Sequence, residues 1–172
     1  MLNNGRVALI PFARRHLPLL YGWLNDVELR AAMGEVTALT ELQVEQYFDR
    51  ASRDPGHAAF IIYEAAARVE VGFITLKDIG PVHRRGELSI AIGRPDKRRQ
   101  GFAADAIQVL CQHAFGNLGL ERIWLTVRTD NVGAIALYRR CGFVEEGTLQ
   151  RFFFCGNRWV DALIMARLKP KG

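Results

Sequence analysis

Two periodicities alternate along the chain, and together they predict a mixed α/β domain. Apolar residues recur at helical spacing in several segments, and short apolar or β-branched runs typical of strands lie between them. Predicted helices cover residues 15–24, 26–34 and 41–53, a stripe from 103 to 114, and a short segment between 131 and 142. Predicted strands cover residues 7–11, 58–63, 69–76, 87–92, 123–127 and 159–168, with strand pieces at 143–144 and 152–154.

Local signals fix several of these boundaries. Asp26 can cap the second helix, and the sequence from Thr40 to Gln43 matches a capping box for the third. The short separation between the strands at 58–63 and 69–76 favours an antiparallel hairpin. Helices and strands alternate, but the hairpins indicate a mixed, mostly antiparallel sheet with flanking helices. We find no internal repeat or linker, so residues 1–172 are expected to form one domain.

The chain is organised around a basic, glycine-bearing loop. An apolar run leads into it and an amphipathic segment follows, so the order is strand, loop, helix. This arrangement points free backbone N–H groups and the positive end of a helix dipole at one place, which is suited to phosphate or pyrophosphate. The loop and the first helical turn hold Arg98, Arg99, Gln100, Gly101, Phe102, Ala103 and Ala104.

Composition narrows the class of protein and the cellular location that we expect. Apolar residues make up 49% of the chain and charged residues 24%, and no apolar stretch reaches the roughly 20 residues that span a bilayer. We see no secretory leader, and three cysteines without a C-x-x-C pair disfavour a disulfide framework or a zinc site. The expectation is a cytoplasmic protein without a metal or membrane partner. The net charge of +5 attracts anions, but no stacking-aromatic motif supports nucleic acid as a partner.

The usual nucleotide-binding motifs do not fit this loop. A dinucleotide fold needs three spaced glycines in the first strand–helix unit, and a Walker loop needs Gly-Lys-Ser/Thr. The run from Arg98 to Ala103 instead resembles the Q/R-x-x-G-x-G/A motif of the GNAT acetyltransferases. The run from Asn131 to Phe143 is similar to that family's N-x-x-A-x-x-L-Y-x-x-x-G-F block. The C-terminal half looks most like RimJ/RimL-type ribosomal-protein acetyltransferases and spermidine acetyltransferases.

This resemblance implies an acetyl-CoA site, with acetyl-CoA as the acetyl donor. It implies that two neighbouring parallel strands, at residues 87–92 and 123–127, splay apart. Backbone groups near Ile90 and Ile92 would pair with the pantetheine arm, and the loop amides would hold the pyrophosphate. The resemblance further suggests that Asn131 touches the CoA arm, which is compatible with its role as a helix cap.

Tyr138 is the candidate acid. An unperturbed thiol has a pKa near ~8.5 and a tyrosine near ~10, so a tyrosine hydroxyl beside the sulfur can donate a hydrogen bond or a proton to the leaving thiolate. The alternative is a core aromatic that packs inward with Ala134 and Leu137. The matched block favours the catalytic interpretation.

Glu87 is the candidate base. An alkyl ammonium must lose a proton before it attacks, and a carboxylate at the strand entrance can accept that proton through water. By strand alternation Glu87, Ser89 and Ala91 share one face. A cross-strand ion pair with Arg85 or another arginine is the equally open alternative. Cys141 is interpreted as packing rather than as an acyl-enzyme nucleophile.

The expected reaction is direct acetyl transfer to a primary amine. A protein N-terminus, a polyamine and an amino sugar remain open as acceptors, and the segment 24–40, with Asp26, Glu28, Arg30 and Glu35, is expected to form much of the acceptor wall. An acyl-CoA-binding or sensing module on the same fold is the alternative. Tyr138 and Glu87 argue against that module, which needs neither. A homodimer is one expectation for the assembly.

Overall fold

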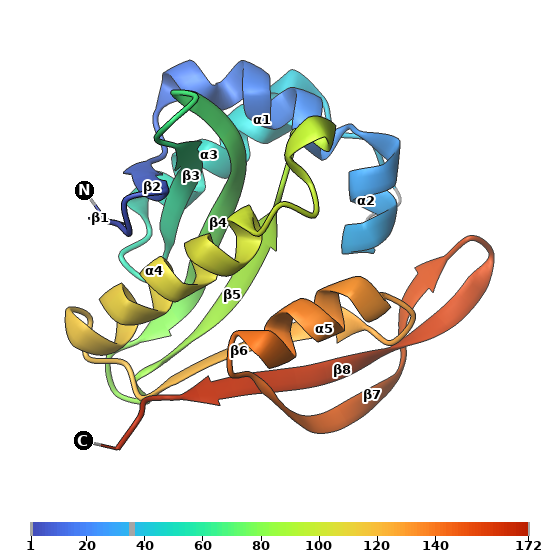
Figure 1. The fold of residues 1–172 in the computed structure, drawn as a ribbon. Coiled ribbons are helices and arrows are strands. Elements are labelled where there is room, and N and C mark those ends of the chain that lie inside the picture. Colours follow the sequence, from blue (N-terminus) through green and yellow to red (C-terminus); the bar gives the residue numbers. More distant parts are fainter. Residues whose placement is uncertain (1, 35–36, 172) are drawn as a thin grey trace.

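The computed structural model describes residues 2–34 and 37–171 and contains one sheet with the strand order β1-β2-β3-β4-β5-β6-β8-β7 (Figure 1). The strands are β1 (Leu2–Asn3), β2 (Val7–Pro11), β3 (Ala58–Glu64), β4 (Val69–Gly80), β5 (Arg85–Ala91), β6 (Arg122–Arg128), β7 (Val144–Cys155) and β8 (Arg158–Leu168). The helices are α1 (Leu17–Leu24), α2 (Val27–Met33), α3 (Glu41–Arg53), α4 (Phe102–Gly116) and α5 (Val132–Arg140), with short 3₁₀ turns η1 (Arg14–His16) and η2 (Pro95–Lys97). The predicted mixed, mostly antiparallel sheet with flanking helices is confirmed.

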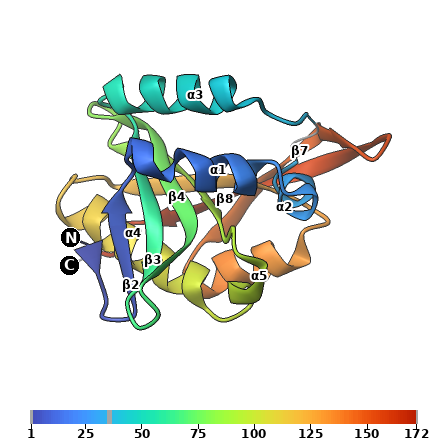
Figure 2. The ribbon, with the colours of Figure 1, turned by 90° about the horizontal axis from the view of Figure 1, so that it is seen from above.

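Helices cover both faces of the sheet. Figure 2 shows α3 on one side of the strands and α5 on the other. The larger apolar cluster packs α4 and α5 against one face and includes Ile107, Leu110, Ile123 and Met165, which are essentially inaccessible. A smaller cluster packs α1, α2 and α3 against the opposite face. The two faces therefore present different surfaces to anything bound at the middle of the sheet.

The middle of the sheet opens where β5 meets β6. These strands form the parallel pair, and their register covers only Arg85 with Arg122, Gly86 with Ile123, and Glu87 with Trp124. Beyond Glu87, β6 stays paired with β8 as far as Arg128, while β5 stays paired with β4. Within residues 2–34 and 37–171, the inner edges of both strands have no strand partner here, and such backbone groups need another hydrogen-bonding partner.

Helix boundaries follow the predicted capping signals. The Asp26 carboxylate accepts a hydrogen bond from the Leu29 amide at 2.8 Å, and α2 ends at Gly34 with φ +81°. Thr40 and Gln43 form the capping box of α3. Asn131 caps α5, because its Oδ1 accepts from the Ala134 amide at 3.2 Å.

Several boundaries differ from the prediction. The strand pieces at 143–144 and 152–154 are parts of one edge strand, β7, whose polar and exposed middle hides its extended conformation from a hydrophobicity pattern. Two register shifts in its pairing with β8 also break strict alternation. The strand predicted at 87–92 begins at Arg85 and ends at Ala91, and β4 continues to Gly80. The first helix begins at Leu17 because η1 precedes it.

Candidate active site

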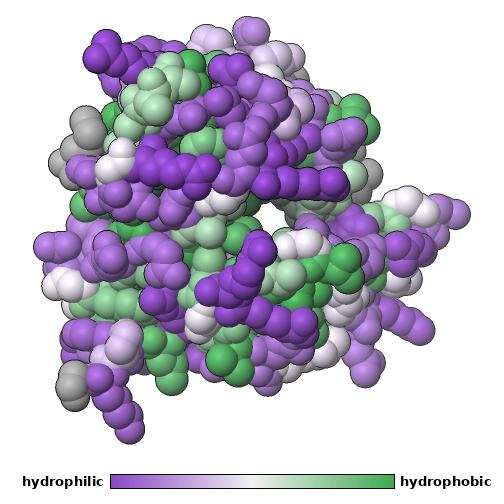
Figure 3. Space-filling model, viewed as in Figure 1, coloured by the Kyte–Doolittle hydropathy of each residue, from purple (hydrophilic) through white to green (hydrophobic). Residues whose placement is uncertain are grey.

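A cavity of about 650 Å³, which we name the splay cleft, lies between the diverging strands. It is bounded by the ends of β5 and β6, by α2, by the start of α4 and by α5. Figure 3 shows an opening in the surface where Figure 1 has the space between β5, α2 and α5. Eight predicted site residues line it: Glu87, Ile90, Ile92, Arg98, Arg99, Ala103, Asn131 and Tyr138.

The basic loop forms one end of the splay cleft. Gly101 lies at φ +90°, a conformation that glycine adopts without strain, and it directly precedes α4. The first helical hydrogen bond runs from the Asp105 amide to the Gly101 carbonyl at 3.1 Å. The amides of Phe102, Ala103 and Ala104 therefore precede the hydrogen-bond ladder and are free to bind an anion.

The side chains of the loop do not all face the cleft. Phe102 is buried in the core, so only its backbone can serve an anion. The Gln100 side chain donates to the Asp96 carbonyl at 2.6 Å. Gln100, Gly101, Phe102 and Ala104 are not among the residues whose surfaces line the cleft. These positions fit a role for the backbone of the loop rather than for its side chains.

Arg98 links the loop to α2. Its guanidinium lies 3.1 Å from Asp26 and 2.9 Å from Glu28, and its Nε donates to the Ile92 carbonyl at 3.2 Å. The Ile92 carbonyl already has a donor, so Ile90 is the better placed of the two predicted backbone partners for a ligand. The Arg98 side chain is engaged within the protein, which leaves Arg99 as the arginine of the pair with a side chain available to the cleft.

Arg6 supports the loop from outside the cleft, and no sequence motif pointed to this residue. Its guanidinium donates to the Gln100 carbonyl at 2.5 Å, pairs with Asp105 at 2.8 Å, and lies 4.5 Å from the Phe102 ring centroid. Arg6 reaches this position because it directly precedes β2, which packs against α4. It stabilises the turn that presents the free amides.

Tyr138 lies on α5 and is 8% exposed, with its ring centroid 5.8 Å from that of Phe143. It is thus both a packed aromatic and a residue that lines the splay cleft. Burial raises the pKa of Tyr138 to about 12. Its hydroxyl consequently keeps its proton at neutral pH and is available to donate a hydrogen bond or that proton to a leaving thiolate.

Glu87 lies at the point where the strands separate. Its carboxylate is 3.6 Å from the Lys77 ammonium, directly across the β4–β5 pair. The cross-strand ion pair anticipated as an alternative therefore exists, but its partner is Lys77 rather than an arginine. Lys77 lies beyond the predicted end of its strand, which is why sequence patterns did not connect the two. Glu87 still lines the cleft, so the ion pair and a role as base are compatible.

A second cavity of about 530 Å³, which we name the basic cavity, lies under α1, α2 and α3. It meets the splay cleft through the shared lining residues Met33, Lys77 and Ser89. The segment 24–40 contributes Leu24, Arg30, Met33, Thr37 and Leu39 to it. Asp26 and Glu28 are turned to Arg98 instead, and Glu35 lies outside the described residues.

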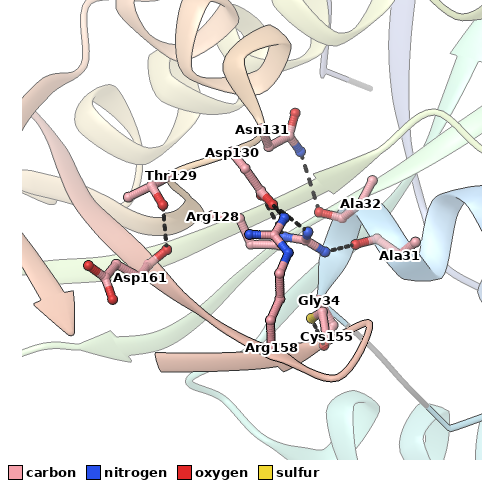
Figure 4. Close-up of polar contacts among 10 residues, drawn as sticks. All are labelled: Ala31, Ala32, Gly34, Arg128, Thr129, Asp130, Asn131, Cys155, Arg158 and Asp161. Atoms are coloured by element: carbon pink, nitrogen blue, oxygen red, sulfur yellow. Dashed lines mark hydrogen bonds and ion pairs between the residues drawn. The ribbon is translucent and has the colours of Figure 1, made fainter. Parts of the chain in front are cut away.

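The C-terminal end of α2 is held over the splay cleft by residues from the other half of the sheet (Figure 4). The Arg128 guanidinium donates to the Ala31 carbonyl, and the Asn131 amide donates to the Ala32 carbonyl at 3.4 Å. Asp130 accepts from Arg128 at 2.8 Å, and the paired guanidinium holds the pKa of that carboxyl below its usual range. Asn131 therefore caps α5 and anchors α2 at the same time.

The cysteines have the properties of packing residues. Cys111 and Cys141 are buried, and burial raises the pKa of Cys111 to about 11 and also raises the pKa of Cys141. A thiol that keeps its proton is a weak nucleophile.

Asp161 and Trp159 lie on the β7–β8 hairpin. Asp161 accepts a hydrogen bond from the Arg151 amide at 2.7 Å, and Trp159 is 56% exposed.

Comparison with known proteins agrees with this geometry. Residues 6–144 match the acetyltransferase (GNAT) domain family. The chain belongs to this family. It is an N-acetyltransferase, and GNAT enzymes take acetyl from acetyl-CoA. The resemblance to RimJ/RimL-type enzymes stays a prediction.

Similar relatives include two bacterial enzymes. The spermidine N(1)-acetyltransferase of Vibrio cholerae serotype O1 is 29% identical over 98% of this chain and 96% of its own length. That of Escherichia coli K12 is 27% identical over 92% and 84%. The crystal structure of the Vibrio cholerae spermidine N-acetyltransferase in complex with CoA and spermine superimposes with a TM-score of 0.90, covering 96% of both chains at 28% identity.

Metal sites and membrane-spanning helices are both absent from the described residues. Within residues 2–34 and 37–171, no group of three or more His, Cys, Asp or Glu side chains is placed to hold a metal ion. Among the helices of the same residues, none is long and apolar enough to cross a membrane.

Proposed function

We propose that this GNAT enzyme transfers acetyl directly from acetyl-CoA to a primary amine, with Tyr138 as the acid and Glu87 as the base. The observation that carries the proposal is the common position of the two residues. Both line the splay cleft, Glu87 from the last position at which β5 pairs with β6 and Tyr138 from α5 across the gap. An acid and a base on opposite sides of a cleft are what acyl transfer to an ammonium requires.

The donor is held by backbone groups. The free amides at the start of α4 bind the pyrophosphate, assisted by the helix dipole and the charge of Arg99. The unpaired edge of β5 around Ile90 offers hydrogen bonds to the amides of the pantetheine arm. Asn131 lies beside this path at the start of α5. The volume of the splay cleft and the open edge of β5 both support the binding of acetyl-CoA at this place.

In the proposed reaction Glu87 accepts one proton from the ammonium through water, which frees the nitrogen lone pair. The C–N bond forms as the C–S bond breaks, and Tyr138 donates its proton to the departing thiolate. The second amine proton returns the tyrosinate to its neutral form. The raised pKas of Cys111 and Cys141 support direct transfer over an acyl-cysteine intermediate.

The similar proteins support proposals on the acceptor, the assembly and the location of the protein. The Vibrio cholerae and Escherichia coli enzymes are named for spermidine, which supports a small-molecule amine; a peptide N-terminus and an amino sugar remain candidates. A dodecameric structure of the Vibrio cholerae enzyme, at a TM-score of 0.81, supports an oligomer rather than only the expected homodimer. Three free cysteines and bacterial relatives support a cytoplasmic location.

The test is a panel of primary amines incubated with acetyl-CoA and the full chain. We expect CoA thiol release that depends on the amine, together with an N-acetyl product detected by mass spectrometry. Tight acetyl-CoA binding without thiol release from any amine would contradict the proposal and would favour a binding module.

A further inference from the structure

The position of the basic cavity suits the part of the acceptor that lies beyond its reacting amine. It lies on the α1–α3 side of the sheet, whereas the loop that precedes α4 lies at the splay cleft. Lys77 and Ser89 line both cavities, and Lys77 contacts Glu87 at 3.6 Å. An amine at Glu87 would therefore have the rest of its molecule in the basic cavity.

The charges of this cavity have one sign. Its lining includes Arg30, Arg50 and Lys77, and among the described residues it includes no Asp or Glu. The Nε of Arg30 is buried and has no hydrogen-bond partner within residues 2–34 and 37–171. Across the same residues, neither Arg30 nor Arg50 forms a salt bridge. Both guanidinium groups are therefore available to an anion.

Of the three cations of the cavity, Lys77 is paired with Glu87, whereas the nearby carboxylates on α2 and α3 do not pair with Arg30 or Arg50. On α2, Asp26 and Glu28 pair with Arg98, and on α3 the carboxylates of Glu45 and Asp49 pair with Arg14. The phosphates of CoA are also unsuited, because none of the loop residues from 98 to 104 lines the basic cavity. The positive charge therefore calls for an anion that enters with the second substrate.

Physical chemistry favours an anionic group here. A buried N–H without a partner is costly, and a carboxylate or phosphate satisfies it while neutralising the charge. The planar guanidinium binds both anions in a bidentate manner. A polyamine would instead bring a second ammonium next to the two unpaired guanidinium groups, which repel it. Apolar side chains, including Phe12, Phe60 and Phe73, suit an uncharged middle section.

We propose that the acceptor is a primary amine that carries a carboxylate or phosphate at its far end, bound by Arg30 and Arg50. This proposal rests on the proposed function and narrows its acceptor class. It separates the chain from its relatives that are named for spermidine, although the fold and the acetyl donor are shared.

The experiment compares acceptors that differ only in their far end. A series of ω-amino acids and aminoalkyl phosphates of increasing length is assayed beside diamines of matched length, alkylamines and spermidine. The readouts are kcat/KM for CoA release and the affinity of each compound for the CoA-saturated enzyme. We expect the best anionic amine to exceed its matched diamine by about tenfold or more in both.

Variants identify the residues responsible. Arg30→Gln and Arg50→Gln should each lower kcat/KM for the anionic acceptor by about tenfold, while alkylamine turnover and acetyl-CoA affinity change little. Arg53→Gln is the matched control, since Arg53 lies on α3 outside the lining of the cavity. Thermal unfolding of each variant excludes a loss of folded protein as the cause.

The outcomes separate the two proposals. Preference for diamines or spermidine, or an unchanged anion preference in the Arg30→Gln and Arg50→Gln double variant, would overturn the anionic acceptor and leave the acetyltransferase mechanism intact. Arginine-dependent binding of anionic amines without any acetylation would support the cavity and overturn the mechanism. If no anionic amine either binds or is acetylated, the anionic acceptor is wrong.

Discussion

Glu87 lies opposite Trp124 in the last parallel pair of β5 and β6, and the two strands separate immediately beyond this pair. The proposed base is thus fixed at the apex of the splay cleft by regular pairing on both sides, because Lys77 is its partner on β4. A rigid strand holds a catalytic group more precisely than a loop does. The same apex joins the basic cavity to the splay cleft.

Replacement of Glu87 tests its role as base. Glu87→Gln should lower kcat/KM by about ten- to a hundredfold, because the amide cannot accept the proton of the ammonium. The acidic limb of the pH–rate profile should change, and activity should recover partly at high pH, where more of the amine is neutral. Glu121→Gln, at a surface carboxylate paired with Arg84, is the control. An acidic limb identical to that of the wild type would exclude Glu87 as the titrating base.

Two variants of the basic loop separate the contribution of its backbone amides to acetyl-CoA affinity from the contribution of its arginine charge. Gly101 has φ +90°, where a valine side chain is strained by about 1–2 kcal/mol, and a Cβ there would lie 3.1 Å from Arg6. Gly101→Val should therefore displace the free amides and weaken acetyl-CoA binding by about tenfold or more, whereas Arg99→Ala should weaken it only a few-fold. Isothermal calorimetry measures both. The reverse order would mean that charge is the main source of affinity.

The raised pKa of Tyr138 should make the folded protein less stable at high pH. Its pKa is about 12 in the folded protein and near ~10 when unfolded, so its contribution is complete below pH ~10 and disappears as pH rises towards 12. The free energy of unfolding of wild type should fall relative to Tyr138→Phe by about 2–3 kcal/mol across this window. Denaturant titrations at each pH measure the difference. A constant difference would show that folding does not raise the pKa of Tyr138.

The cysteines provide a test of direct transfer. Cys141→Ala should leave kcat within a few-fold of wild type and give no change in burst kinetics, since a buried, protonated thiol does not form an acyl-enzyme. In the native protein a thiol reagent should modify Cys155, which is partly exposed, before Cys111 and Cys141. Loss of all turnover in a folded Cys141→Ala variant would contradict direct transfer.

Much of the fold could be predicted because its local signals agree with its tertiary structure. Caps such as Asp26, Thr40 and Asn131 mark helix starts through hydrogen bonds within three residues, and these need no knowledge of the fold. The edge strand β7 could not be predicted as one element, because its exposed positions lack the apolar alternation that marks a half-buried strand. Pairing with β8 defines it instead.

The site was predictable only where a motif carried it. Arg98, Arg99 and Ala103 of the loop, with Asn131 and Tyr138 of the α5 block, line the splay cleft, and their roles stay predictions. Contacts between distant segments were out of reach: Arg6 with Asp105, Lys77 with Glu87, and the basic cavity itself depend on strand register and helix packing. The inward orientation of Arg98 was missed for the same reason, since its carboxylate partners lie on α2.

The most direct test of the account is the turnover of Tyr138→Phe with acetyl-CoA and a primary amine that the wild type acetylates. The substitution removes one hydroxyl from a packed ring, so folding and acetyl-CoA affinity should be nearly unchanged. Loss of the acid should lower kcat by about a hundredfold or more. A Tyr138→Phe enzyme with wild-type kcat would contradict the central claim that Tyr138 protonates the leaving thiolate.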